Sequence, residues 1–160
     1  MKKIVSALLL SALLLCAPLA CAEEVPAISD GLFSAAKEAL SLLSYGEYGR
    51  VSEVLPFSGE APGAEEWESF AGNFSTLDSG TVQRDISVAY WDGSCWWLAV
   101  PVREPSVDSV EAMLLRSDDG STISGYRYAD WGSVKSGYGS SNYVKWNEEY
   151  VAGTPVIVAD

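Results

Sequence analysis

The spacing of hydrophobic residues along this chain changes once, near residue 80. Before that point, apolar residues recur at intervals of three and four, which is typical of amphipathic helices. After it, apolar and polar residues alternate at every second position, which is typical of half-buried strands. This order predicts an α+β fold in which N-terminal helices pack on a curved antiparallel meander sheet.

Three helices are expected before the change of period. The longest covers residues 32–43, with Ser29-Asp30-Gly31 as its N-cap and Gly46 as a left-handed C-terminal cap. A short helix follows and ends before Pro56, which cannot continue it. The third covers residues 65–74, with Trp67, Phe70 and Phe74 on one face.

Four strands are expected after it, over residues 81–91, 95–103, 110–116 and 122–129. They complete a domain that spans residues 23–131. Residues 132–160 are expected to form a Gly/Ser-rich loop and a C-terminal tail that packs on the domain, with a last short strand over 154–159.

The turn at Asp92-Gly93 predicts the register of the first hairpin. A three-residue loop that starts at Trp91 sets Val88 opposite Trp96. A two-residue turn would mix large and small side chains on both faces, and a slip of one residue inverts every side chain. The preferred register gathers large apolar residues on one face, which is expected to pack on the long helix: Ile86, Val88, Tyr90, Trp96, Leu98, Val100 and Val102.

The second hairpin carries the same kind of turn at Asp118-Asp119-Gly120. A three-residue loop there pairs Leu115 with Ile123. It also sets Glu111 opposite Arg127 as a cross-strand pair of opposite charge.

The first twenty-two residues read as a bacterial signal peptide. Two lysines precede an apolar run, and Ala20-Cys21-Ala22 supplies the small residues that a signal peptidase reads. The run is too short to span a bilayer, which needs about 20 residues. We expect a secreted protein that begins at Glu23, with no transmembrane segment in the mature chain. The alternative is a lipoprotein anchored through Cys21.

Charge and composition exclude several classes of function. Two of the ten basic residues lie in the leader and all twenty-two acidic residues follow it, which leaves a formal charge of −14. Such a charge opposes binding to nucleic acid. The acidic residues are interpreted either as a solvated surface of an exported protein or as a binding site for cations or cationic ligands. Cys95 is the one cysteine beyond the leader and is expected to be a buried apolar residue.

The chain has no histidine, which excludes Ser-His-Asp and Cys-His catalysis and His-ligated metal sites. No catalytic residue, metal site or cofactor is predicted. Glu65 and Glu66 form a carboxylate pair, but acidic residues in the first turn of a helix are expected from the helix dipole alone.

The order of elements resembles a known superfamily. A helix that ends in Leu-Leu-Ser-Tyr-Gly-Glu-Tyr, two shorter helices with Trp67 and Phe70, and a long meander resemble the cone-shaped fold of nuclear transport factor 2 and its relatives. More closely, the chain looks like the small exported bacterial proteins of unknown function in that superfamily. The resemblance implies a pocket at the open end of the cone and carries over no catalytic residue.

The aromatic residues supply the candidate site. Trp91, Trp97, Tyr126 and Tyr128 alternate away from the face assigned to the long helix, so they are expected on the second face of the sheet. A dimer through the sheet and the C-terminal tail are rival covers for that face. The candidate ligand-binding residues are Trp67, Tyr90, Trp97, Tyr126 and Tyr128.

The leading hypothesis is an exported non-catalytic domain that binds a small molecule or a protein partner through a pocket or a sheet face. One alternative is a small cone-fold enzyme, isomerase-like or cyclase-like, that uses a carboxylate and a tyrosine. The other is a cell-wall or carbohydrate-binding module, which requires coplanar exposed aromatic rings.

Overall fold

The chain folds into four helices and one sheet over the residues that the structure, a computed structural model, describes: 25–75, 77, 87–102, 110–141, 143–146 and 157–158. The predicted leader and Cys21 lie outside these residues. Three helices come first, α2 (Asp30–Ser44), α3 (Tyr48–Val54) and α4 (Ala64–Ala71). The strands and one further helix follow: β1 (Val88–Trp91), β2 (Trp96–Pro101), β3 (Glu111–Ser117), β4 (Gly125–Asp130), α5 (Trp131–Gly139), β5 (Tyr143–Trp146) and β6 (Ile157–Val158). This architecture confirms the predicted α+β class.

The six strands form one antiparallel sheet in the order β4-β3-β2-β1-β5-β6. Strands β1 to β4 are the predicted meander, and β6 lies within the last strand expected from the sequence. Strand β5, which belongs to the predicted tail, pairs with β1 along its whole length. None of the described helices has the length and apolar character needed to cross a membrane.

Helix α5 corrects the prediction of a Gly/Ser-rich loop after Trp131. Asp130 caps the helix, because its carboxylate accepts hydrogen bonds from the backbone N–H of Ser133 at 2.9 Å and from its hydroxyl at 2.5 Å. Three aromatic or apolar residues, Trp131, Val134 and Tyr138, recur at helical spacing and pack on the sheet. The glycines between them concealed this pattern in the sequence.

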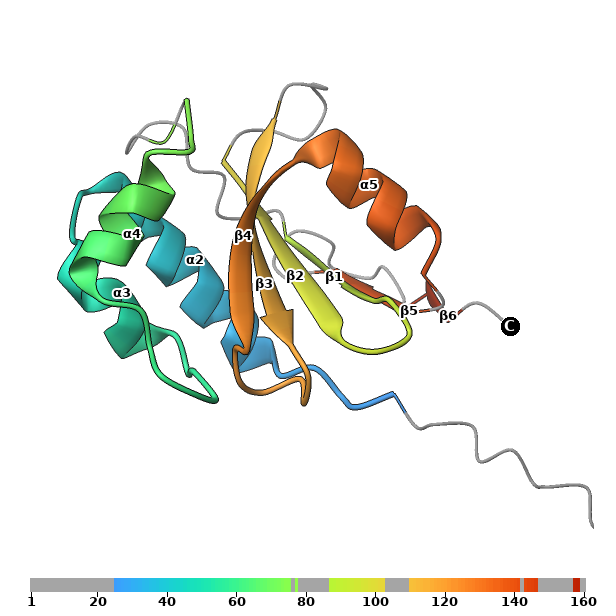
Figure 1. Cartoon of the computed structure of the whole chain (residues 1–160). Helices are drawn as coiled ribbons and strands as arrows, with labels where there is room; N and C mark the ends of the chain where they lie inside the picture. The colour runs from blue at the N-terminus through green and yellow to red at the C-terminus, as the bar shows by residue number, and fades with distance from the viewer. Residues whose placement is uncertain are drawn as a thin grey trace, which may run out of the picture.

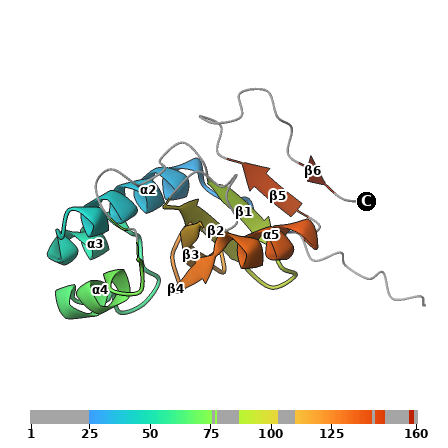
Figure 2. The same ribbon diagram turned by 90° about the horizontal axis from the view of Figure 1, so that it is seen from above.

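Helices cover both faces of the sheet. Figure 1 shows α2, α3 and α4 on one side of the strands and α5 on the other, and Figure 2 shows the same layers from above. The face under α2–α4 carries the larger core, which includes Leu40, Trp67 and Leu98. The face under α5 carries a smaller core, which includes Val88, Leu114 and Trp131. A segment of the predicted tail therefore covers the second face.

The register of the first hairpin differs from the prediction. Val88 lies opposite Ala99 and Trp91 lies opposite Trp96, so four residues rather than three form the loop. The carboxylate of Asp92 explains the longer loop, because it accepts hydrogen bonds from the backbone N–H groups of Ser94 and Cys95. Trp96 and Leu98 face α2 as predicted, whereas Val88 and Tyr90 face α5. Ile86 lies outside the described residues.

The second hairpin is also paired differently. Leu115 lies opposite Tyr126, and Glu111 lies opposite Asp130 rather than Arg127. Asp119 holds the longer loop, because its carboxylate accepts hydrogen bonds from the backbone N–H groups of Ser121 and Thr122. The predicted pairs of Leu115 with Ile123 and Glu111 with Arg127 are therefore wrong.

These registers change the faces of the aromatic residues. Trp91, Tyr126 and Tyr128 lie on the face under α2–α4, and the prediction that placed them on the second face is wrong. Trp97 does lie on the second face, where it packs against the core under α5.

Candidate functional site: a hollow between α4 and β4

The structure divides the five candidate residues into two groups. Trp67, Tyr126 and Tyr128 lie on the α4 side of the sheet, whereas Tyr90 and Trp97 lie on the α5 side. The five side chains therefore form no single site. Their role in ligand binding stays a prediction.

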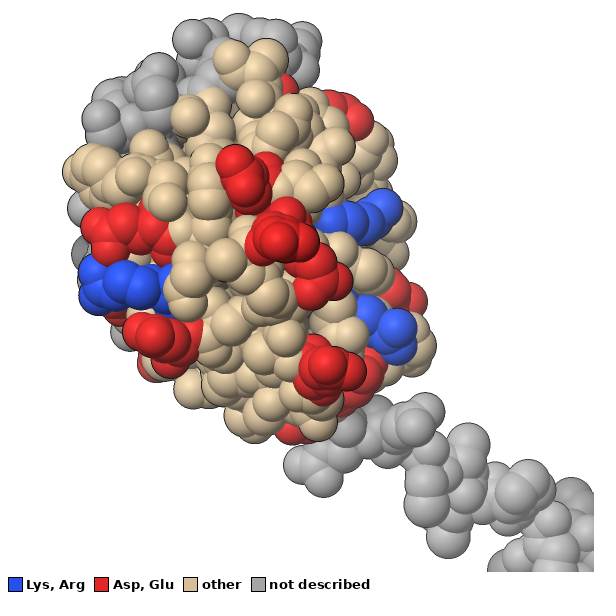
Figure 3. Space-filling view, turned by 60° about the vertical axis from the view of Figure 1, so that its left-hand side comes forward, with Lys and Arg blue, Asp and Glu red and all other residues tan. Residues whose placement is uncertain are grey.

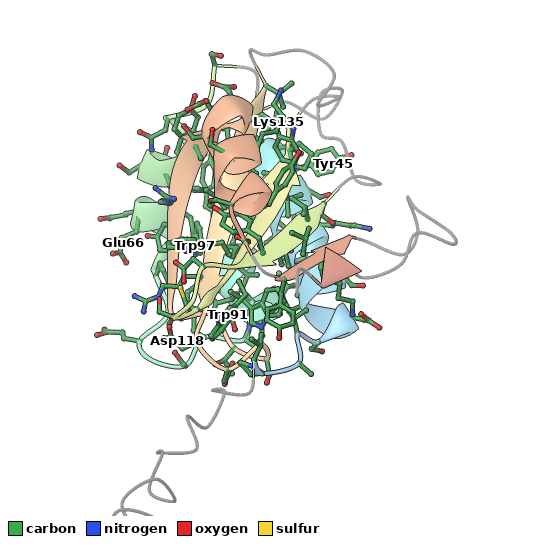
Figure 4. The ribbon with its side chains drawn as sticks, turned by 90° about the vertical axis from the view of Figure 1, so that its right-hand side faces the viewer. Tyr45, Glu66, Trp91, Trp97, Asp118 and Lys135 are labelled. Carbon is green, nitrogen blue, oxygen red and sulfur yellow. The ribbon has the colours of Figure 1, made fainter. Side chains whose placement is uncertain are left out.

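The α5 side offers few free polar groups. Tyr90 is buried beside Gly137 of α5, and this burial raises the pKa of its phenol. The indole N–H of Trp97 donates to the carboxylate of Asp92 at 2.7 Å, and the guanidinium of Arg127 lies 4.6 Å from the centre of the Trp97 ring. Figure 4 shows Trp97 on this side of the molecule, with Glu66 at the far edge of α4.

Asp92 anchors the loop beside Trp97. Burial opposes its charge, but hydrogen bonds from Trp97, Cys95 and Ser94 outweigh that effect and hold the pKa of Asp92 well below its usual range. A carboxylate so fully engaged supports the hairpin rather than a ligand. Cys95 is buried as expected, and this burial raises the pKa of its thiol.

Tyr128 belongs to a second structural contact. Its hydroxyl donates to the buried carboxylate of Glu111 at 3.1 Å. The same carboxylate accepts hydrogen bonds from the backbone N–H of Ser75 at 2.9 Å and from its hydroxyl at 3.0 Å. Glu111 thereby ties the segment after α4 to β3 and β4.

Tyr126 lies at the surface of the larger core and forms the floor of a hollow. Its ring centre is 4.4 Å from that of the fully buried Trp67 and 5.1 Å from that of Phe70, with an edge-on orientation to Phe70. The hollow has a volume of about 430 Å³. Five residues of the α4 segment line it together with Tyr126: Glu65, Glu66, Ser69, Phe70 and Asn73.

The rings behind Tyr126 are held rigidly. The indole N–H of Trp67 donates to the hydroxyl of Ser52 at 2.8 Å, and that hydroxyl donates to the carbonyl of Pro62 at 2.7 Å. The chain before α4 is thus tied to the Trp67 ring, against which Tyr126 packs at a tilt, so these hydrogen bonds hold the floor of the hollow in place without a ligand.

The polar groups of the hollow differ from those near Trp97. Among the described residues, none makes a hydrogen bond with the Tyr126 hydroxyl. Burial raises the pKa of Tyr126, and the negative charge of Glu66 raises it further. One carboxylate oxygen of Glu66 accepts from the backbone N–H of Gly63 at 2.8 Å, which fixes the side chain at the start of α4.

Acidic side chains gather on this side of the molecule (Figure 3). Glu65, Glu66 and Glu68 are all exposed on α4. Among the described residues, no three acidic, cysteine or histidine side chains are grouped to hold a metal ion. The hollow combines exposed carboxylates with an aromatic floor.

Of the residues chosen from the sequence, Tyr126 lines the hollow, whereas Trp67 does not. The carboxylates of Glu65 and Glu66 were considered and set aside, and Ser69, Phe70 and Asn73 were not chosen as site residues. Glu66, Phe70 and Asn73 recur at spacings of four and three, which places them along one side of the α4 segment. That spacing could have located the rim. The contact of this segment with Tyr126 depends on the register of β4, which the sequence did not predict.

Comparison of the chain with protein-family models, with curated proteins and with solved structures finds no match. The resemblance to the nuclear transport factor 2 superfamily therefore stays a prediction.

Proposed function

We propose that this protein is an exported, non-catalytic domain that binds a small organic amine in the hollow between α4 and β4. The observation that carries the proposal is that Tyr126, whose hydroxyl has no hydrogen-bond partner among the described residues, lines the same hollow as the carboxylates of Glu65 and Glu66. An ammonium group can lie over the Tyr126 ring and donate to the Glu66 carboxylate at the same time.

Two features support a cationic ligand over a neutral one. The rim carries carboxylates and an amide but no basic residue. The charge of −14 beyond the leader also attracts cations over long distances and raises their local concentration. A sugar-binding platform is less well supported, because Trp67 is fully buried behind Tyr126.

The expected affinity is modest. A partly exposed cation–π contact contributes roughly 0.5–1 kcal/mol. An exposed ion pair contributes a similar amount, and burial of an alkyl chain adds roughly 0.8 kcal/mol per methylene group. After the cost of association, these contributions suit a Kd of roughly 0.1–1 mM at low salt.

Calorimetric titration with spermidine at low ionic strength tests the proposal. Glu66→Gln keeps an acceptor for the Gly63 N–H and removes the charge, so it should weaken binding about threefold to tenfold while the fold persists. Glu38→Gln is the matched control, because it removes one exposed charge from α2, outside the hollow.

A neutral triol of similar length is the second control, and it should not bind measurably. If Glu66→Gln and Glu38→Gln weaken spermidine binding equally, binding depends only on net charge, and the proposal would fail.

A further inference from the structure

A second cavity lies on the α2 side of the described sheet, beside the chain that precedes α2. Its volume is about 330 Å³, and it lies between the chain before α2 and strands β2 and β5. The α4–β4 hollow includes a residue of β4, and the second cavity includes residues of β5. Three strands separate β4 from β5 in the sheet, so the two cavities are distinct. We call this second cavity the N-terminal groove, and seven residues line it: Val25, Pro26, Ala27, Ile28, Trp96, Tyr143 and Lys145.

The wall formed by residues 25–28 is fixed in place. The indole N–H of Trp96 donates to the carbonyl of Pro26 at 2.7 Å, and the backbone N–H of Ser29 donates to the carbonyl of Gly120 at 2.8 Å. Gly120 also touches this segment so closely that an added Cβ would lie 2.2 Å from the carbonyl oxygen of Ala27. The groove is therefore preformed.

One charge lies in an otherwise apolar lining. Lys145 is the single charged residue among the seven, and its side chain is 20% exposed. It pairs with Asp30 at the start of α2 and lies 5.8 Å from the centre of the Phe33 ring. The Asp30 side chain is 67% exposed, so water can solvate it when another anion takes its place.

A second polar group lies beside this lysine. The hydroxyl of Tyr143 makes no hydrogen bond to a described residue, although its ring lines the groove. Lys145 and Tyr143 lie two residues apart on β5, so their side chains project from the same face of that strand.

We propose that the N-terminal groove binds a small amphiphile with one carboxylate. The apolar body would lie against Trp96 and Ile28, and the carboxylate would accept hydrogen bonds from Lys145 and Tyr143. Charge complementarity favours an anion, because the lining holds one cation and no acid, and the Asp30 carboxylate that pairs with this cation lies outside the lining. This site takes a ligand of opposite charge to that of the α4–β4 hollow and does not depend on it.

Titration with octanoate, octylamine and octanol separates charge from apolar contact. The protein used is the chain from Glu23 onward, which contains every described residue. Octanoate should bind at least about fivefold more tightly than either analogue, which corresponds to a partly buried ion pair. The Trp96 indole signal in a ¹H–¹⁵N spectrum, assigned with Trp96→Phe, should shift as octanoate is added.

Two substitutions should act in opposite directions. Lys145→Met should weaken octanoate binding about fivefold or more, whereas Asp30→Asn should strengthen it about twofold to fivefold, because the lysine loses its competing carboxylate. Lys135→Gln on α5 is the control for loss of one positive charge and should leave binding unchanged. Asp30→Asn keeps every residue of the lining, so it tests the proposal even if Lys145→Met fails to fold.

Equal affinity for octanoate and octylamine would overturn the proposal. So would unchanged octanoate binding in the Asp30→Asn variant, or shifts at other indoles with none at Trp96.

Discussion

The two faces of the sheet leave different groups available to a ligand. Under α2–α4, aromatic contacts run from Trp67 to Tyr126, which ends at the surface with a hydroxyl that bonds to no described residue. Under α5, Trp97 also reaches the surface, but its N–H is bonded to Asp92 and Arg127 lies against its ring. Aromatic exposure alone is therefore a poor guide to a binding site. The availability of hydrogen-bonding groups separates the two faces.

Replacement of Trp67 and of Trp97, one residue from each face, is expected to give the largest effect. Trp67→Ala should lower the free energy of unfolding by about 3–5 kcal/mol, because a fully buried indole leaves a cavity. Trp97→Ala should cost clearly less, since Trp97 is only half-buried. Urea denaturation of both variants measures the difference, and equal losses would contradict the assignment of the two faces.

Substitution of Gly120 tests the wall of the N-terminal groove. Gly120→Ala should cost about 2–4 kcal/mol, because Gly120 has a φ of +77° and its Cβ would overlap the backbone of Ala27. Gly93→Ala is the control, with a φ of +101° and nothing within 4 Å of its Cβ. In thermal unfolding, Gly93→Ala should lower the stability less than Gly120→Ala does. An equal loss of stability in the two variants would argue against the close contact with residue 27.

The α5 face can be tested at its closest contact. A Cβ at Gly137 would lie 2.8 Å from the ring of Tyr90, so Gly137→Ala should destabilise the protein by about 1–2 kcal/mol despite its better helix propensity. Gly139 belongs to the same helix and has nothing within 4 Å of an added Cβ. Gly139→Ala should therefore be neutral or stabilising in the same assay, and a reversed order would mean that α5 packs differently.

The β3–β4 loop offers a test through pH. Backbone hydrogen bonds from Ser121 and Thr122 lower the pKa of Asp119 to about 2. Since this folded-state value lies below the unfolded value of about 3.9, the charged carboxylate stabilises the fold above pH 4 and loses that effect as pH falls toward 2.

Asp119→Asn should cost no more than about 1 kcal/mol at pH 7, because the group is mostly exposed and solvent screens it. The difference in the free energy of unfolding between wild type and Asp119→Asn, measured by chemical denaturation, should become smaller as the pH falls from 4 to 2.5. A constant gap over that range would mean that the charge of Asp119 does not stabilise the loop.

Part of this fold was predictable from local pattern. Spacing of apolar residues predicted α2 and α4, and Gly46 adopts the expected left-handed φ of +73°. The hairpin registers were not predictable in this way, because the carboxylates of Asp92 and Asp119 each organise a loop through side-chain hydrogen bonds. Turn residues alone do not specify loop length when a side chain supplies the closing bonds.

The candidate site was predictable only in fragments for the same reason. Trp67 and Tyr126 were both selected for their aromatic rings, yet the register that brings them together was wrong. The Trp131–Gly139 helix was missed because glycine lowers helix propensity, although Trp131, Val134 and Tyr138 keep helical spacing.

The most direct test of the amine-binding claim compares one indole from each face in a single titration. Spermidine is added at low ionic strength while the indole ¹H–¹⁵N signals of Trp67 and Trp97 are followed, with assignments from Trp67→Phe and Trp97→Phe. We predict a saturable shift at Trp67, whose ring lies 4.4 Å from that of Tyr126, and no shift at Trp97. A shift at Trp97 with none at Trp67, or shifts at neither, would contradict the claim that the α4–β4 hollow binds amines.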